Sequence, residues 1–336
     1  MRSPIVQDLY WLAIVVMIRL AGWIPSWRIR RAIAKGCGWL GYVSSPKRRQ
    51  RIAKNLAVAY EDQLTQQETD QIIREYFYEY WREALSLLPA GDRAVLQKAN
   101  IEGWEHLESA LERGKGVILW EASVFGSRNA SKQILRDKGI AVHQVHSQNH
   151  LGWIGTSLRS GTALRGRVIV PIIQGWMARF VESIVWLRER ESLAFTRPLL
   201  RVLKRNDVVC STADGSWGQR LALVEHLGRR RVFATGMVSL AKVSGAALLP
   251  LFCVQDRDGI PTLTIGPPIA VEAGEGRQSA LQNGVAQWVA LFESHVKAHP
   301  GKYRAWHITF WEGGDREEGP SASTGPSLET LGGELR

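Results

Sequence analysis

Polar side chains gather directly after an apolar run a third of the way along the chain. The run Val117–Glu121 ends in a carboxylate, and the hydroxyl of Ser123 follows two residues later. A glutamate that is shielded from water has a raised pKa and serves as a general base. Because alternate residues of a strand share one face, we expect Glu121 to reach Ser123. The stretch therefore predicts the centre of an active site, with Glu121 and Ser123 as catalytic residues.

A second carboxylate follows another predicted strand. Residues 207–212 are mostly apolar and lead to Asp214, which opens a Gly-containing turn over 214–220. A carboxylate at the carboxyl end of a parallel strand usually faces the cleft where ligands bind. The alternative is a turn or a helix N-cap. We predict a catalytic role for Asp214.

Three histidines, His143, His146 and His150, lie close together in the sequence. The odd spacing of the first two places them on opposite faces of a strand, and no Cys or Asp nearby completes a set of metal ligands. His146 is an alternative general base. We expect neither a metal nor a cofactor, because Walker, G-x-G-x-x-G and G-x-S-x-G patterns are absent from the sequence and its three cysteines lie far apart. The H-x4-E spacing that begins at His307 is expected by chance.

Helices and strands alternate through the body of the chain. This alternation predicts an α/β fold with a mostly parallel sheet flanked by helices. The predicted strands are 117–121, 140–146, 168–173, 207–212, 246–254 and 261–265, and the predicted helices are 127–138, 150–160, 193–204, 235–244 and 278–298.

The N-terminal segment combines apolar and basic residues. Residues 1–60 carry eleven Lys and Arg against the single Asp8, which leaves about +1 for the rest of the chain. Such a segment needs an anionic partner, and the apolar run 9–17 favours a membrane surface over nucleic acid. About 16 apolar residues fall short of the roughly 20 that span a bilayer. We expect an in-plane or marginally inserted helix, with packing on the protein's own core as a compatible alternative.

The predicted organisation has four parts. Residues 1–35 form the membrane-associated helix, 36–110 a helical region, and 111–312 the α/β domain. Residues 313–336 are rich in Gly, Ser and Pro and have few apolar residues, so we expect a disordered tail.

An ordered set of short stretches resembles a known family. They include Arg51-Ile-Ala-Lys-Asn-Leu, Ile101-Glu-Gly-Trp-Glu-His-Leu, Gly114-Lys-Gly-Val-Ile-Leu and His299-Pro. From about residue 5 to 311 the chain resembles the lipid A biosynthesis (lauroyl/myristoyl) acyltransferases, within the lysophospholipid acyltransferase superfamily. The resemblance implies a glycerolipid acyltransferase-like fold. It also implies transfer of an acyl group from acyl-carrier protein, or another thioester, to a hydroxyl of a membrane lipid. The expected location is the cytoplasmic face of the inner membrane of a Gram-negative-type bacterium.

The chain departs from the H-x4-D/E pair that the resemblance implies after the first strand, where His is the base and the acid orients it. Ser123 and Arg128 fall at those two positions, or Val124 and Asn129 with a shift of one residue. One interpretation is a rewired acyltransferase with Glu121 or His146 as base and Asp214 in support. The alternatives are a catalytically silent relative that binds lipid or acyl carrier, and a transferase with another acceptor. The predicted contacts to an anionic substrate are Arg128, Asn129, Lys132 and Arg197.

Overall fold

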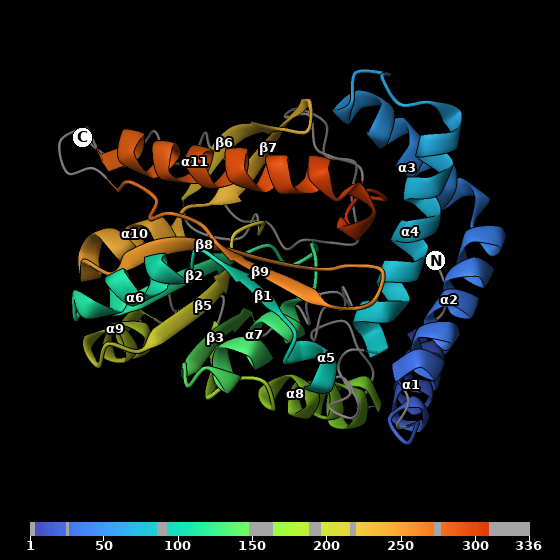
Figure 1. Cartoon of the computed structure of the whole chain (residues 1–336), viewed down its shortest axis with the longest axis horizontal. Helices are drawn as coiled ribbons and strands as arrows, with labels where there is room; N and C mark the ends of the chain where they lie inside the picture. Colours follow the sequence, from blue (N-terminus) through green and yellow to red (C-terminus); the bar gives the residue numbers. More distant parts are fainter. Residues whose placement is uncertain are drawn as a thin grey trace.

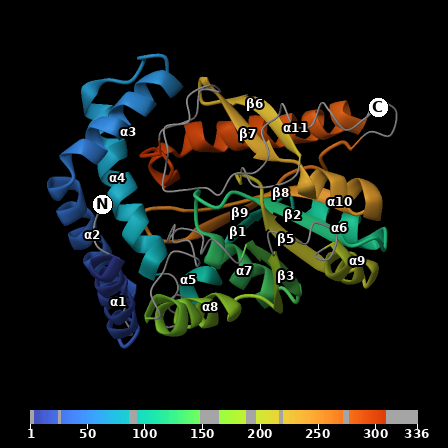
Figure 2. The same ribbon diagram turned by 180° about the vertical axis from the view of Figure 1, so that it is seen from behind.

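The computed structural model describes residues 4–24, 27–85, 93–147, 164–187, 196–215, 220–271 and 277–308. A seven-stranded sheet with the order β1-β9-β8-β2-β5-β3-β4 forms its centre, and β6 and β7 form a separate antiparallel hairpin. Helices cover both faces of the sheet, and α1 to α4 gather beside it (Figure 1). The same block of helices stands at one side in the reverse view (Figure 2).

The strands are short, and most of them are followed by a helix. Their bounds are β1 (Asn100–Glu102), β2 (Val117–Glu121), β3 (Val142–Ser147), β4 (Ser183–Leu187), β5 (Val208–Thr212), β6 (Leu221–His226), β7 (Arg229–Ala234), β8 (Ala247–Gln255) and β9 (Pro261–Ile265).

The helices fall into an N-terminal group and a group that covers the sheet. The first group is α1 (Pro4–Ala21), α2 (Trp27–Ser44), α3 (Pro46–Ala59), α4 (Gln66–Leu85) and α5 (Arg93–Leu96). The second is α6 (Trp104–Glu112), α7 (Arg128–Asp137), the π-helix η3 (Arg165–Ile169), α8 (Val170–Ala178), α9 (Thr196–Lys204), α10 (Gly236–Ser244), α11 (Arg277–Ala298) and the 3-10 helix η4 (Pro300–Lys302).

Strand β2 lies at the middle of the sheet and is buried along its whole length. It pairs in parallel with β5 and with β8, so Val117 is opposite Val208 on one side and Ala247 on the other. Ile118 and Trp120 belong to the core that contains α11, while Val117 and Leu119 belong to the core beneath α6 and α7. Burial on both faces explains why the strand is apolar without alternation.

The sheet is parallel except at one edge. Strand β9 runs antiparallel to β8, and β1 then pairs in parallel with β9. The turn between β8 and β9 is fixed by Asp256, whose carboxylate accepts hydrogen bonds from the backbone N–H of Asp258 at 2.8 Å and of Ile260 at 2.9 Å. The predicted α/β fold with a mostly parallel sheet is therefore confirmed.

Helix α1 packs on the rest of the protein with one face. Val15 and Ile18 contribute to a core with Ile173 and Trp176 of α8. At its start, Asp8 forms a buried ion pair with Arg165 of η3, at 2.6 Å between Asp8 Oδ1 and Arg165 Nη2. None of the helices in the described ranges is long and apolar enough to cross a bilayer. The prediction that α1 packs on the protein's own core is correct for this face.

Helix α2 lies unusually close to α4. A Cβ on Gly38 would stand 2.9 Å from the backbone of Tyr78, closer than real Cβ contacts. Glycine at this position lets the two helix backbones touch, so α2 packs directly against α4. The N-terminal helices are thus part of the packed structure.

Several sequence predictions need correction. Residues 168–173 were predicted to be extended, yet they lie in η3 and α8. A short apolar run does not distinguish a buried strand from a buried helix. Strands β1, β4, β6 and β7 were not predicted. The predicted helix over 150–160, His150 and the tail 313–336 lie outside the described residues.

Candidate functional site

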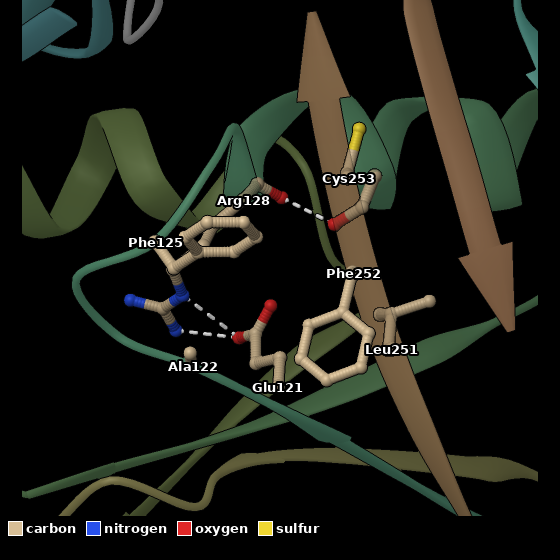
Figure 3. Close-up of a pocket in the computed structure, with 8 residues that line it drawn as sticks. Glu121, Ala122, Phe125, Arg128, Leu251, Phe252 and Cys253 are labelled. Carbon is tan, nitrogen blue, oxygen red and sulfur yellow. Dashed lines mark hydrogen bonds and ion pairs between the residues drawn. The ribbon is translucent and has the colours of Figure 1, made fainter. Parts of the chain in front are cut away.

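The carboxylate of Glu121 closes β2 and points towards α7. Alternation along the strand places it on the same face as Val117 and Leu119, which is the face that α7 covers. Arg128 and Lys132 stand one helical turn apart on α7 and so meet the same carboxylate. The guanidinium of Arg128 donates two hydrogen bonds to Glu121 Oε1, at 2.6 Å from Nη2 and 2.9 Å from Nε (Figure 3). The ammonium of Lys132 donates to the other oxygen, Oε2.

All three charges of this cluster are withdrawn from solvent. The side chains of Glu121, Arg128 and Lys132 are 3%, 13% and 4% exposed. Burial raises the pKa of Glu121, but Arg128 and then Lys132 outweigh burial and lower the pKa to about 2. The expectation of a raised pKa is therefore wrong, because the sequence did not place two cations on this carboxylate. Glu121 is a fixed anion at neutral pH, and cations bind both of its oxygens.

Asp214 anchors the segment that follows β2. Its carboxylate accepts hydrogen bonds from the backbone N–H of Ser123 at 2.8 and 2.9 Å, from the Ser123 hydroxyl at 2.9 Å and from the backbone N–H of Val124 at 3.3 Å. The chain turns directly after Glu121, so strand alternation ends there and Ser123 faces β5. Ser123 was predicted to contact Glu121 and instead contacts Asp214.

Residues 122–127, which we call the β2–α7 loop, are also held from the side of β8. Gly126 has a φ of +60°, and a Cβ there would lie 2.0 Å from the carbonyl oxygen of Cys253. The backbone N–H of Ser127 donates to that same carbonyl at 2.7 Å. Arg304 donates from its backbone to the Val124 carbonyl and from its guanidinium to the Gly126 carbonyl, both at 2.7 Å. The loop is therefore fixed at nearly every residue.

A chain of buried charges extends from this loop to α4. Arg82 donates from Nη2 to the Ser127 hydroxyl at 2.8 Å and forms an ion pair with Glu79. Lys302 reaches Glu79 at 2.7 Å and Glu75 at 2.9 Å. Burial opposes the charge on Glu79, but Arg82 and Lys302 together lower its pKa. The sequence analysis missed this network.

One sequence signal pointed to that network. Glu79 and Glu83 recur at the spacing of Ile72 and Tyr76, which form the buried face of α4. Carboxylates on the apolar face of a helix are rare unless they are paired. The pattern therefore indicates buried cations opposite α4, although it does not identify them.

His146 lies at the carboxyl end of β3 and is 9% exposed. Its ring packs against that of Trp186 on β4, with the centroids 5.8 Å apart. Burial lowers its pKa to about 3, and the charge of Arg128 acts in the same direction. The imidazole is consequently neutral at physiological pH, is a weaker base than an ordinary histidine, and retains a lone pair that can accept a proton. His143 has a different setting, since its Nδ1 lies 2.7 Å from the Ser183 hydroxyl.

The comparisons with known proteins were decisive at the family level. The family described as Bacterial lipid A biosynthesis acyltransferase matches residues 3–311, nearly the whole chain. The chain belongs to this family. A comparison with curated proteins found no match. The resemblance stated from the sequence is confirmed, and membership supports an acyltransferase function in general terms.

The remaining predicted residues of this acyltransferase-family protein are less closely grouped. Arg197 is exposed in the first turn of α9, and no contact joins it to Glu121 or Asp214 within the described part of the chain. Asn129 is half-buried in the first turn of α7. Arg128 and Lys132 face Glu121 rather than solvent, so their role as substrate contacts stays a prediction. No group of three potential metal ligands is found among the residues that the structure describes.

The space beside Glu121 is small. A cavity of about 10 Å³ is lined by Glu121, Arg128, Ser131 and Cys253, and the rings of Phe125 and Phe252 flank it (Figure 3). Such a volume holds about one water molecule. In the conformation described, this cavity is too small for an acyl chain.

Proposed function

We propose that this protein transfers a fatty acyl group from an acyl-carrier thioester to a hydroxyl of a lipid A-type or related membrane lipid. The observation that carries the proposal is the family match over residues 3–311. Glu121, Asp214 and His146 stand at the carboxyl ends of β2, β5 and β3, which are neighbours in the sheet. Ligands bind at this edge in open α/β sheets.

His146 is the base in this proposal. Glu121 is unsuited because Arg128 and Lys132 bind both of its oxygens. The carboxylate of Asp214 already accepts hydrogen bonds from Ser123 in the β2–α7 loop. A neutral imidazole takes the proton of the acceptor hydroxyl as its oxygen attacks the thioester carbonyl. The C–S bond then breaks, and the imidazolium returns the proton to the leaving sulfur, which departs as a thiol. Asp214 acts by positioning Ser123 and the loop.

A second candidate function is supported by a separate observation. Ser123 and Arg128 occupy the positions of the H-x4-D/E pair, and Arg128 is buried against Glu121 with space for about one water beside them. This arrangement favours a catalytically silent relative that binds a lipid or an acyl carrier.

Membrane association is part of both candidates. Of thirteen exposed large apolar side chains among the described residues, eight lie between residues 9 and 43. Exposed apolar groups concentrated in one region mark an interaction surface, and the basic N-terminal segment suits an anionic cytoplasmic leaflet. The eight are Leu9, Val16, Leu20, Trp23, Ile29, Trp39, Leu40 and Val43.

The deciding experiment incubates the purified protein with acyl-carrier thioesters and bacterial membrane lipids and follows acylated products by mass spectrometry. We expect transfer by the wild type and its loss in His146→Gln. Transfer that persists in His146→Gln contradicts the role of His146 as base. If no acceptor is acylated and native mass spectrometry finds a bound lipid or acyl carrier, the silent candidate replaces the first one.

A further inference from the structure

A second, much larger hollow lies away from the Glu121 cluster. It is a groove of about 750 Å³ between α2, the end of α5 and the turn that joins β8 to β9. None of its lining residues belongs to the site described above. They are Arg28, Arg31, Ala32, Lys35, Val95, Lys98, Asp258 and Ile260.

The groove is strongly basic. Four of its eight lining residues are cationic, against the single carboxylate of Asp258. That carboxylate lies 3.9 Å from Arg31 Nη1 and is 82% exposed, so it screens the groove only weakly. Arg28, Lys35 and Lys98 are all exposed. The net charge of the lining favours an anion with several oxygens, such as a phosphate.

The walls of the groove are firmly placed. Helix α2 is held against α4 at Gly38, and the turn on the opposite wall is held by the carboxylate of Asp256. Between the charges lie the apolar side chains of Ala32, Val95 and Ile260. A ligand that joins a phosphate to a less polar portion therefore matches this lining.

Exposed apolar side chains lie close in sequence to the basic residues of α2. Ile29, next to Arg28 on α2, is 53% exposed, and Trp23 just before α2 is 77% exposed. Apolar and basic groups side by side on a helix are typical of a lipid interface. A nucleic acid would give the exposed aliphatic side chain of Ile29 no apolar partner.

We propose that this groove binds the phosphate of an anionic lipid headgroup while the exposed apolar residues of α1 and α2 contact the bilayer. The inference goes beyond the proposed function, since it assigns a binding site that the acyl-transfer step does not use. Lys35 of α2 and Lys98 just after α5 both line the groove, and we assign them to the phosphate.

The test uses the full chain and vesicles of phosphatidylcholine with and without phosphatidylglycerol, in the absence of any thioester. The variant is Lys35→Gln/Lys98→Gln. The control is Lys115→Gln/Lys138→Gln, which removes the same charge from two exposed lysines. Lys115 lies just before β2 and Lys138 just after α7, both at the amino ends of the strands. Each lysine near an anionic surface contributes about fivefold, so the groove variant should bind phosphatidylglycerol vesicles roughly 25-fold more weakly. The control should stay within about twofold of the wild type.

Equal vesicle binding by the groove variant and the control overturns the proposal. A calorimetric titration with glycerol 3-phosphate distinguishes the source of the phosphate. If the wild type binds glycerol 3-phosphate, the groove variant does not, and vesicle binding is unchanged, the groove serves a soluble phosphate and the lipid assignment is wrong. Circular dichroism checks that both variants are folded. Because no acyl donor is present, these outcomes are independent of whether the protein transfers acyl groups.

Discussion

Asp214 binds Ser123 twice, through its backbone N–H at 2.8 Å and through its hydroxyl at 2.9 Å. The two residues are separated by 91 positions in the sequence, and their contact joins the ends of β2 and β5. The carboxylate therefore sets the path of the β2–α7 loop. Ser123 is thereby held in one position at the carboxyl ends of the strands, where the chemistry is proposed.

The first prediction concerns this contact. In Asp214→Asn the amide NH₂ can face the N–H groups of Ser123 and Val124, so the loop shifts. We expect a loss of about 100-fold in kcat/KM for acyl transfer, as for a misplacement of about 1 Å. Steady-state assays measure it. Asp62→Asn is the control, since Asp62 is exposed with a φ of +58°, which Asn also tolerates. Equal activity of the two variants would show that Asp214 has no positioning role.

The second prediction is about stability. Glu121→Gln leaves Arg128 and Lys132 buried without their carboxylate, and breaking a buried ion pair from one side costs about 3–5 kcal/mol. We expect the free energy of unfolding in urea to fall by that amount. The control is Glu112→Gln at the exposed end of α6, where a change within about 0.5 kcal/mol is expected. A similarly small change for Glu121→Gln would mean that the cluster is solvated.

The third prediction follows from the pKa of Glu121, which is about 2 in the folded protein against an ordinary value of 4.5. A lowered folded pKa contributes stability that is present above the unfolded pKa and is lost as the pH falls towards the folded pKa. The wild type should lose about 3 kcal/mol between roughly pH 5 and pH 2 through this group. Urea titrations at several pH values measure the loss, and Glu121→Gln should lack this component. Parallel curves for the two proteins would refute the ion-paired state.

The fourth prediction concerns the proton acceptor. With a pKa of about 3, His146 is deprotonated throughout the range from pH 5 to 8. The rate of acyl transfer should show no acid limb near pH 6.5 from this group, and His146→Gln should lower kcat about 100-fold or more. His106→Gln on α6 is the matched control. An acid limb near pH 6.5 that disappears in His146→Gln would show that its pKa is ordinary and the site open to water.

The fifth prediction concerns the apolar surface of the N-terminal helices. Leu20→Gln/Trp23→Gln removes two side chains that are 51% and 77% exposed, and binding to neutral phosphatidylcholine vesicles should weaken at least tenfold. Val243→Gln, at a site 67% exposed on α10, should leave binding unchanged. Sedimentation with vesicles measures both. If the two variants bind alike, these helices do not form the membrane surface.

Deleting residues 1–35 is a less informative experiment. It removes Asp8 and thereby leaves the buried guanidinium of Arg165 without its carboxylate. It also uncovers Ile173 and Trp176 of α8. If residues 1–35 were a separate membrane-associated part of the chain, the deletion would be expected to give a soluble protein. The packing of α1 on η3 and α8 predicts instead that the shortened protein is destabilised.

The sequence was sufficient for the middle strands of the sheet. Strand β2, the helix after it and β5 were predicted within one or two residues, because strong apolar runs end at charged or Gly-containing turns. The β6–β7 hairpin was not predicted, because residues 221–234 lack the regular alternation of polar and apolar residues that is typical of strands. The edge strands β1 and β4 are short and gain their structure from pairing with β9 and β3.

The place of the candidate residues in the fold was predicted from the sequence, but the hydrogen bonds and ion pairs between them were not. Glu121, Ser123 and Asp214 do lie at one edge of the sheet, as the strand order requires. The partners depend on where α7 and α4 pack: Arg128 and Lys132, predicted as substrate contacts, bind Glu121, and the sequence did not reveal this pairing. Sequence spacing gives the face of a helix, but not which charge on a distant element lies opposite it.

The buried pair of Asp8 and Arg165 has a consequence for biosynthesis. The two residues are 157 positions apart. At roughly 5–20 residues per second, the ribosome adds Arg165 about 8–30 s after Asp8. Helix α8, which covers Val15 and Ile18, is completed later still. During this interval the first helix can meet only the part of its core that is already synthesised, Ala34 of α2 and Ala84 and Leu85 of α4, so its contacts with η3 and α8 form last.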